Sequence, residues 1–94
     1  MSGFVYILKS ENSALYYKGI TEDYQRRLIE HNSGKSTFTA NHIPWKLLYV
    51  EAHPTKRDAL IRERKLKGCK KEYFEWLASQ PTNILLMLPG HGLS

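Results

Sequence analysis

Two tyrosines, an arginine and a histidine lie close together near the start of this 94-residue chain. Tyr6 and Tyr17 occupy two short aromatic and β-branched segments, and Arg27 and His31 follow one turn apart in a predicted helix. A guanidinium can clamp a phosphate, an imidazole can move a proton, and a phenol becomes a base where nearby cations lower its pKa. Each residue alone also suits a structural role, since strands favour aromatic residues and helix C-termini favour positive charge. Their combination indicates a site.

Glu63 is the candidate acid for this site. At about 100° per residue it falls in the apolar stripe that Ala59, Leu60 and Leu66 define on a predicted helix. A carboxylate in that stripe needs a partner, because desolvating it alone is costly. Two interpretations stay open, an i,i+4 ion pair with Lys67, which is the commoner arrangement, or a ligand to Mg²⁺, which takes only one or two protein carboxylates.

Several other classes of site are excluded by the residues present. The chain has no Gly-x-Ser-x-Gly, P-loop, dinucleotide or His-Glu-x-x-His sequence. Its single cysteine, Cys69, forms no internal disulfide or cysteine zinc site and fits a reducing, cytoplasmic setting. No apolar run approaches the roughly 20 residues that cross a bilayer, and no basic region precedes the first strand, so we expect no signal peptide and no membrane partner.

The positive charge is concentrated in one part of the chain. The net charge is +5, and the segment 56–71 carries eight basic residues against Asp58 and Glu63, so it holds the whole positive excess. A positive stripe on one helix is expected for a protein that binds a polyanion, but a solvated helix face explains it equally well. The basic residues of this segment are Lys56, Arg57, Arg62, Arg64, Lys65, Lys67, Lys70 and Lys71.

The patterning predicts one α+β domain. Strands are expected at 4–8, 15–20 and 45–52, and helices at 22–32, 55–67 and 70–79, which gives a small antiparallel sheet covered by helices. Alternation along the second strand places Lys18 on the opposite face from Tyr17. Gly19, close to the end of that strand, suggests the close approach of another backbone or a ligand.

The helices have recognisable ends and faces. Thr21 is the expected N-cap of the first helix, with Glu22 and Asp23 in its first turn and the sequence Ser33-Gly34 at its end. Arg27, His31 and Tyr24 are expected on one side of that helix, with Arg26 and Glu30 on the other. Thr55 is a plausible cap for the second helix, and the expected apolar anchors of the third are Tyr73, Phe74, Trp76 and Leu77.

The connections and the tail complete this organisation. The polar segment 35–44 is long enough for a functional loop. Residues 1–80 form the expected domain, and residues 81–94 form a tail that is docked or flexible. Its apolar run 84–88 suits either the body of the domain or a second chain.

At this point the residues resemble a known family. The segments Val5-Tyr6-Ile7-Leu8, Tyr17-Lys18-Gly19 and Arg27-Leu28, then His31-Asn32-Ser33-Gly34, then Ala59-Leu60 with Glu63, are similar to the GIY-YIG nuclease domain. The closer resemblance is to its small single-domain bacterial group, UPF0213, which Trp45-Lys46-Leu47 and the segment 62–67 also fit. The resemblance covers about residues 3–76.

The resemblance implies a three-stranded antiparallel sheet flanked by helices, and a phosphodiesterase site. It implies that Glu63 holds one divalent ion, Mg²⁺ or Mn²⁺, and that Arg27 stabilises the pentacovalent phosphate. Tyr6 and Tyr17 would position and deprotonate the attacking water, and His31 would transfer a proton or contact substrate. Such a division of roles is chemically reasonable, because charge develops on the phosphate and the leaving oxygen.

Three positions depart from the family pattern. Val5 stands where the family has the glycine of its name, and Lys18 replaces an isoleucine and could add a phosphate contact. Many family nucleases have a late asparagine near the site, but Asn83 follows Pro81 at a spacing that does not carry that role over.

The sequence therefore predicts a metal-dependent endonuclease that hydrolyses nucleic acid, with DNA favoured over RNA. The residues expected to contact the substrate backbone are Lys18, Arg62, Lys65, Lys67, Lys70 and Lys71. The alternative is a nucleic-acid-binding module of the same fold with little or no activity. A third possibility, ranked lower, is a protein-interaction domain that uses the 85–88 tail and the 74–76 surface.

Overall fold

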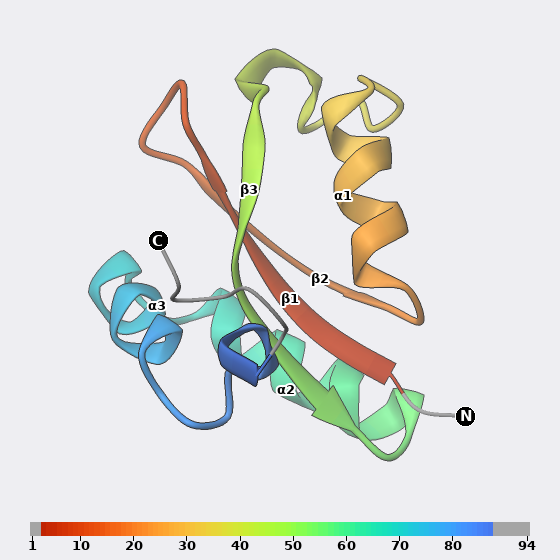
Figure 1. The fold of residues 1–94 in the computed structure, drawn as a ribbon, viewed down its shortest axis with the longest axis vertical. Helices are drawn as coiled ribbons and strands as arrows, with labels where there is room; N and C mark the ends of the chain where they lie inside the picture. Colours follow the sequence, from red (N-terminus) through yellow and green to blue (C-terminus); the bar gives the residue numbers. More distant parts are fainter. Residues whose placement is uncertain (1–2, 88–94) are drawn as a thin grey trace.

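The computed structural model describes residues 3–87, which form a three-stranded sheet with helices on both faces (Figure 1). The elements in chain order are β1 (Gly3–Ser10), β2 (Tyr16–Thr21), α1 (Tyr24–Asn32), η1 (Ala40–His42), β3 (Trp45–His53), α2 (Lys56–Lys67), α3 (Lys71–Ala78) and η2 (Ile84–Met87). The α+β class and the order of strands and helices predicted from the sequence are confirmed. No helix within residues 3–87 is both long enough and apolar enough to span a membrane.

The central strand of the sheet is β1, which pairs antiparallel with β2 on one side and β3 on the other. Tyr6 lies opposite Gly19 of β2, and that pairing is important for the site. The register with β3 shifts between Ile7 and Leu8, so Leu48 is the extra residue of a bulge. Because β2 is an edge strand, no further strand pairs with its outer side, and residues from both faces of the sheet can reach it.

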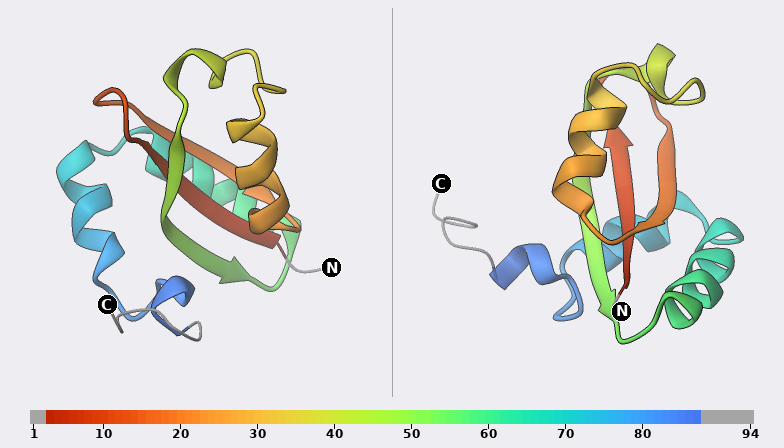
Figure 2. Two further views of the ribbon diagram at one scale, coloured as in Figure 1. Left: turned by 45° about the horizontal axis from the view of Figure 1, so that its top comes forward. Right: turned by 90° about the vertical axis from the view of Figure 1, so that its right-hand side faces the viewer.

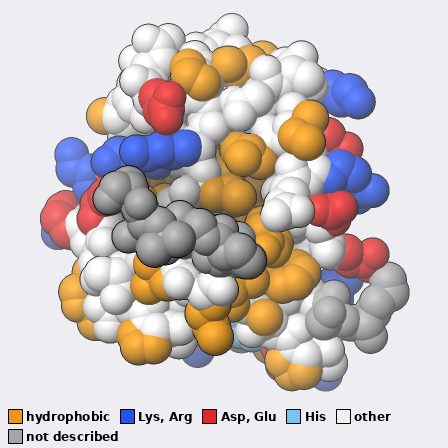
Figure 3. All heavy atoms as spheres, viewed as in Figure 1, with side chains coloured by type: hydrophobic (Ala, Val, Ile, Leu, Met, Phe, Trp, Pro, Cys, Tyr) orange, Lys and Arg blue, Asp and Glu red, His pale blue; other side chains and the backbone are white. Residues whose placement is uncertain are grey.

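Alternation along the strands divides the apolar side chains into two clusters, one on each face of the sheet. Val5 and Ile7 pack with Ala59 and Leu66 of α2 and with residues of α3. Tyr6 and Leu8 face the other way, toward α1, the N-terminal end of β3 and η2. The views in Figure 2 show α1 and α2 on different sides of the sheet. In Figure 3 hydrophobic side chains gather at the centre of the face in view, with charged residues toward its sides.

The first helix begins later than the sequence predicted. Its N-cap is Asp23, whose carboxylate accepts a hydrogen bond of 3.0 Å from the Arg26 amide, so Thr21 as N-cap is wrong. Thr21 ends β2 instead, and its hydroxyl accepts from the Asp23 amide in the turn between strand and helix. The predicted stop is confirmed, with Ser33 as C-cap and Gly34 at a φ of 83°, a left-handed conformation that glycine adopts without strain.

The second and third helices pack against the opposite face. The Thr55 cap of α2 is confirmed, since its hydroxyl accepts from the Asp58 amide. Ala59 and Leu66 are buried as expected, but Leu60 is exposed and does not belong to the buried stripe. On α3 only Phe74 and Leu77 are buried, and Trp76 is 55% exposed, so Trp76 as an apolar anchor is wrong. It stacks on Tyr73 at the surface.

Residues 81–87 are docked on the sheet through Asn83, which is 2% exposed. Its side-chain oxygen accepts from the amides of Val50 and Leu85, and its side-chain nitrogen donates to the carbonyls of Leu48 and Ala78. Asn83 thus provides side-chain partners for backbone groups of β3, α3 and η2. The remainder of the predicted tail, including Leu88, lies outside the described residues.

Candidate active site

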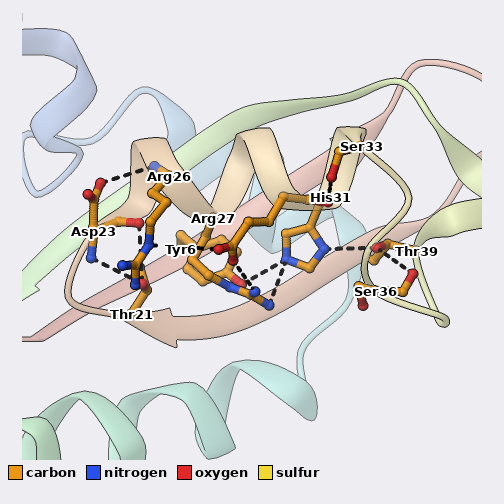
Figure 4. A network of polar contacts seen from close by, with 10 residues as sticks. Tyr6, Thr21, Asp23, Arg26, Arg27, His31, Ser33, Ser36 and Thr39 are labelled. Carbon is orange, nitrogen blue, oxygen red and sulfur yellow. Dashed lines mark hydrogen bonds and ion pairs between the residues drawn. The ribbon is translucent and has the colours of Figure 1, made fainter.

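Tyr6, Arg27 and His31 converge beneath α1, together with Thr39 from the segment between α1 and β3 (Figure 4). The Tyr6 hydroxyl lies 3.0 Å from His31 Nε2, and Arg27 Nη2 lies 3.4 Å from the same nitrogen. On the other side of the ring, His31 Nδ1 lies 2.8 Å from Thr39 Oγ1. The structure therefore brings together three of the predicted site residues and adds a fourth, Thr39.

The hydrogen bonds define one protonation state for His31. A guanidinium can only donate, so Nε2 is an acceptor and the ring proton lies on Nδ1. Nδ1 then donates to Thr39 Oγ1, whose own proton goes to the carbonyl of Ser36 at 3.4 Å. Burial, aided by the Arg27 charge, lowers the pKa of His31 below its ordinary value, which favours this neutral form.

Tyr6 is 1% exposed, and its hydroxyl donates to His31. Burial raises the pKa of Tyr6 to about 12, despite a hydrogen bond with Arg27 that acts in the opposite direction. The nearby Arg27 does not bring the pKa of Tyr6 below its ordinary value, because desolvation of the phenolate outweighs the effect of the guanidinium. Tyr6 is placed to orient His31 rather than to contact solvent.

Glu30 holds Arg27 in this arrangement. Arg27 Nη1 donates to Glu30 Oε1 at 2.6 Å, and Arg26 Nε lies 3.8 Å from Glu30 Oε2. The expected separation of Arg27 from Glu30 around the helix is therefore wrong, because i,i+3 side chains are also neighbours. The carboxylate raises the pKa of Arg27 above its already high value, so the guanidinium stays charged.

Gly19 is the position where the phenol of Tyr6 crosses the neighbouring strand. A Cβ atom at Gly19 would lie 2.7 Å from the Tyr6 hydroxyl oxygen and 2.8 Å from Cζ. The close approach suggested by the sequence is made by a side chain, the phenol of Tyr6. Only glycine leaves room for the phenol to reach His31.

Tyr17 connects this buried cluster to an open hollow at the β2 edge. Its ring centroid is 4.7 Å from that of His31 and 6.1 Å from that of Tyr6. The hollow has a volume of about 440 Å³, and Tyr17 lines it with residues from the opposite face of the sheet. Its other lining residues are Tyr16, Lys18, Phe38, Glu63 and Lys67. The candidate site therefore wraps around the edge of the sheet.

Glu63 reaches this hollow from α2 and is buried except for the side that lines it. Its Oε2 forms an i,i+4 ion pair of 3.1 Å with Lys67. This is the ion pair that the sequence indicated as the alternative to a metal ligand. No cluster of three or more histidine, cysteine or acidic residues that could hold a metal occurs within residues 3–87. One carboxylate in an open hollow nevertheless fits an Mg²⁺ ion that keeps water and phosphate oxygens as its other ligands.

Lys18 and Lys67 give the hollow a positive wall. Lys18 Nζ lies 5.2 Å from the Phe74 ring centroid, on the opposite face from the Tyr17 ring, as alternation predicted. Burial and the Lys67 charge lower the pKa of Lys18, and Glu63 opposes this shift. Both lysines are therefore close enough to Glu63 to place positive charge around its carboxylate.

The remaining predicted substrate contacts do not form one stripe. Arg62 Nε donates to both oxygens of Glu51, at 3.1 and 3.2 Å, and its Nη2 donates to Tyr73, so its guanidinium is occupied within the fold. Lys65 lies about 200° around α2 from Lys67 and lines a different hollow, with Arg62. Lys70 and Lys71 are exposed at the start of α3. The single basic stripe expected on the helix is thus divided between two sides.

Thr39 and Phe38, both in the segment 33–44, were not identified as site residues from the sequence. Thr39 is buried, its carbonyl accepts from the Trp45 indole, and its hydroxyl fixes His31. The available signal was the length and polarity of the segment, which indicated a functional loop without indicating which residue faces inward.

The fold and the comparisons with known proteins define the class of this protein. The GIY-YIG catalytic domain matches residues 2–75, which is most of the chain. The chain therefore belongs to the GIY-YIG catalytic-domain family.

The chain is also similar to proteins named UPF0213. The chain is 35% identical over 82 residues to a UPF0213 protein of Haloquadratum walsbyi, covering 86% of this chain and 91% of that protein. It is 45% identical over 74 residues to a UPF0213 protein of Pseudomonas aeruginosa, covering 78% and 70%. A solution NMR structure of the UPF0213 protein BH0048 from Bacillus halodurans superposes with a TM-score of 0.53 at 32% identity, covering 87% of each chain.

Proposed function

We propose that this protein is an endonuclease that uses a divalent metal, Mg²⁺ or Mn²⁺, to hydrolyse phosphodiester bonds in nucleic acid, DNA in preference to RNA. The observation that carries the proposal is the hollow at the β2 edge, which joins Glu63 and two lysines to Tyr17 and, through its ring, to His31 and Arg27. Family membership supports the same reaction class. Positive groups around one carboxylate suit a phosphate that shares a metal with that carboxylate.

Each group has a separate role in this proposal. Glu63 holds the metal, which when bound would neutralise charge on the phosphate oxygens. Arg27, fixed by Glu30 and permanently charged, stabilises the negative charge that develops on the phosphate. Tyr17 is the phenol that lines the hollow and therefore the one that contacts the attacking water.

His31 and Tyr6 act behind Tyr17. The Nε2 lone pair of His31, beside the Tyr17 ring, already accepts from Tyr6 and Arg27, so His31 holds these two groups in place next to Tyr17. Tyr6 is a positioning residue in this scheme, since its buried hydroxyl holds Nε2 in place. The Nδ1 proton is fixed by Thr39 and does not take part.

A cleavage assay tests the proposal directly. The full chain is incubated with single-stranded, nicked, branched and duplex DNA and with matched RNA, in Mg²⁺, Mn²⁺ or EDTA. We expect metal-dependent cleavage that Glu63→Gln abolishes while binding is retained, and faster cleavage of DNA than of RNA. Glu72→Gln is the matched control, because Glu72 is an exposed acid on α3 that does not line the hollow. An absence of cleavage on every substrate in both metals would refute the nuclease.

A second candidate function is binding without catalysis. The ion pair between Lys67 and Glu63 favours it, because a lysine already neutralises the carboxylate that a metal would need. In that case Glu63→Gln would leave binding unchanged and no substrate would be cut, whereas Lys67→Ala would weaken binding and reduce its dependence on salt.

A further inference from the structure

Phe38 lines the hollow but has no role in the proposed reaction. It lies in the segment between α1 and β3, and its side chain is 66% exposed. A single exposed apolar side chain needs no special explanation. Phe38 differs because it lines the same hollow as Glu63, Lys18 and Lys67.

The rings of His31, Tyr17 and Phe38 form a row that runs from the buried cluster to solvent. The His31 and Tyr17 centroids are 4.7 Å apart, and the Tyr17 and Phe38 centroids are 6.0 Å apart with planes inclined by 44°. His31 is fully buried, and Tyr17 is partly buried. Because most of the Phe38 side chain is exposed, part of its ring is free to contact another planar group.

The groups around Phe38 indicate the chemistry of that planar group. Two ammonium groups share its hollow, so the ligand carries negative charge next to the part that contacts the ring. A nucleotide combines a flat, uncharged base with a phosphate, and bases stack on aromatic side chains with about 1–3 kcal/mol of binding free energy each. An inorganic anion such as free phosphate would satisfy the lysines but leave the ring surface unused.

We propose that Phe38 stacks on one unpaired nucleobase of the substrate, and that Lys18 and Lys67 hold the phosphates next to it. A base inside a duplex has both of its faces covered by neighbouring bases, so the base on Phe38 lies in a single strand. The inference rests on the proposed function only in requiring that the hollow takes nucleic acid. It gives Phe38 a binding role and no part in the bond-breaking step.

Binding measured without metal tests this role. The full chain in EDTA is titrated with a short single-stranded oligodeoxynucleotide that carries a 2-aminopurine, and with the corresponding blunt duplex. We expect 2-aminopurine fluorescence to be quenched on binding to the single strand. Phe38→Leu keeps an apolar side chain but removes the aromatic plane, and it should weaken binding about 5- to 20-fold, near the low end of measured stacking effects.

Two further variants serve as controls. Phe38→Trp keeps an aromatic plane and should bind within about twofold of the unmodified chain, with quenching retained. Trp76→Leu removes another exposed aromatic side chain, on α3, that does not line the hollow, and should change neither affinity nor quenching. Thermal unfolding of each variant shows whether the exposed position affects the fold.

Unchanged affinity and quenching in Phe38→Leu would overturn the stacking role. An equal loss of affinity for single strand and duplex would also overturn it, since stacking requires an accessible base. These outcomes are separate from the failure of the nuclease. If the chain stacks the probe but never cleaves in Mg²⁺ or Mn²⁺, the Phe38 role holds and the proposed catalysis is refuted. If Phe38→Leu binds and cleaves as the unmodified chain does, the catalysis holds and the Phe38 role is refuted.

Discussion

Replacement of Gly19 by alanine tests how tightly the two strands fix the Tyr6 phenol. The new Cβ would lie 2.7 to 2.9 Å from three atoms of Tyr6, closer than real Cβ contacts allow. Tyr6 is buried among Leu8, Val50 and other apolar residues, so its ring cannot move aside without disturbing that cluster. Overpacking of this kind costs about 1–3 kcal/mol, and a displaced phenol also loses its bond to His31.

Urea denaturation of Gly19→Ala measures this cost. We expect the free energy of unfolding to fall by about 1–3 kcal/mol. In a domain of this size, each kcal/mol lowers the melting temperature by roughly 4–8 °C. Gly68→Ala is the matched control, because a Cβ there meets only the Lys65 carbonyl at 3.7 Å, an ordinary contact. It should be within about 0.5 kcal/mol of the unmodified chain.

A double-mutant cycle tests whether the new Cβ displaces the phenol. Tyr6→Phe keeps the ring carbons that the Cβ approaches but removes the hydroxyl bond to His31, which the displaced phenol of Gly19→Ala also loses. The Gly19→Ala and Tyr6→Phe pair should therefore be less unstable than the sum of the single variants. Strict additivity, or a Gly19→Ala variant as stable as the unmodified chain, would refute the steric explanation for glycine at this position.

Three further predictions follow from the geometry. Because the folded-state pKa of His31 is lowered, the unfolded chain binds more protons below pH about 6.5, so the free energy of unfolding falls as pH falls through that range. His31→Gln should make the free energy of unfolding, measured by urea titration at several pH values, depend less on pH. An identical pH dependence in the variant would contradict this prediction. Asn83→Ala leaves buried backbone groups of β3 unpaired, so it should lower the free energy of unfolding by about 2–4 kcal/mol and speed amide exchange at Val50. An exchange rate equal to that of the unmodified chain would show that the docking of residues 81–87 does not depend on Asn83. Arg62→Ala should mainly lower thermal stability, because it leaves Glu51 without its guanidinium partner. Lys67→Ala should mainly weaken nucleic-acid binding at low salt. Equal losses of binding affinity in the two variants would mean that Arg62 also contacts the ligand.

The strands and helices of the fold could be predicted because they depend on local sequence patterns. Each strand is a short aromatic and β-branched run, and the end of α1 at Gly34 and the Thr55 cap of α2 have side-chain signatures that depend on few neighbours. The start of α1 was misplaced because Thr21 and Asp23 are both good caps, and the choice depends on how far β2 continues. Trp76 was misassigned because angular position alone does not say how far the neighbouring sheet extends.

The candidate site was only partly predictable for a different reason. Alternation and helical spacing placed Tyr17, Arg27 and His31 in compatible positions, and the apolar neighbours of Glu63 indicated its burial. The tertiary contacts determined everything else. The burial that raises the Tyr6 pKa, the hydroxyl of Thr39 on His31, and the turn of Phe38 into the hollow each involve residues distant in sequence or in an irregular segment.

The hollow at the edge strand β2 is lined by residues from both faces of the sheet. Tyr17 belongs to the layer beneath α1, whereas Glu63 comes from α2 on the other layer. A ligand that contacts both residues would therefore act as a non-covalent cross-link between the layers. Such a cross-link adds stability in proportion to the logarithm of ligand concentration over Kd, and it should slow amide exchange in α1 and α2 together rather than in one of them.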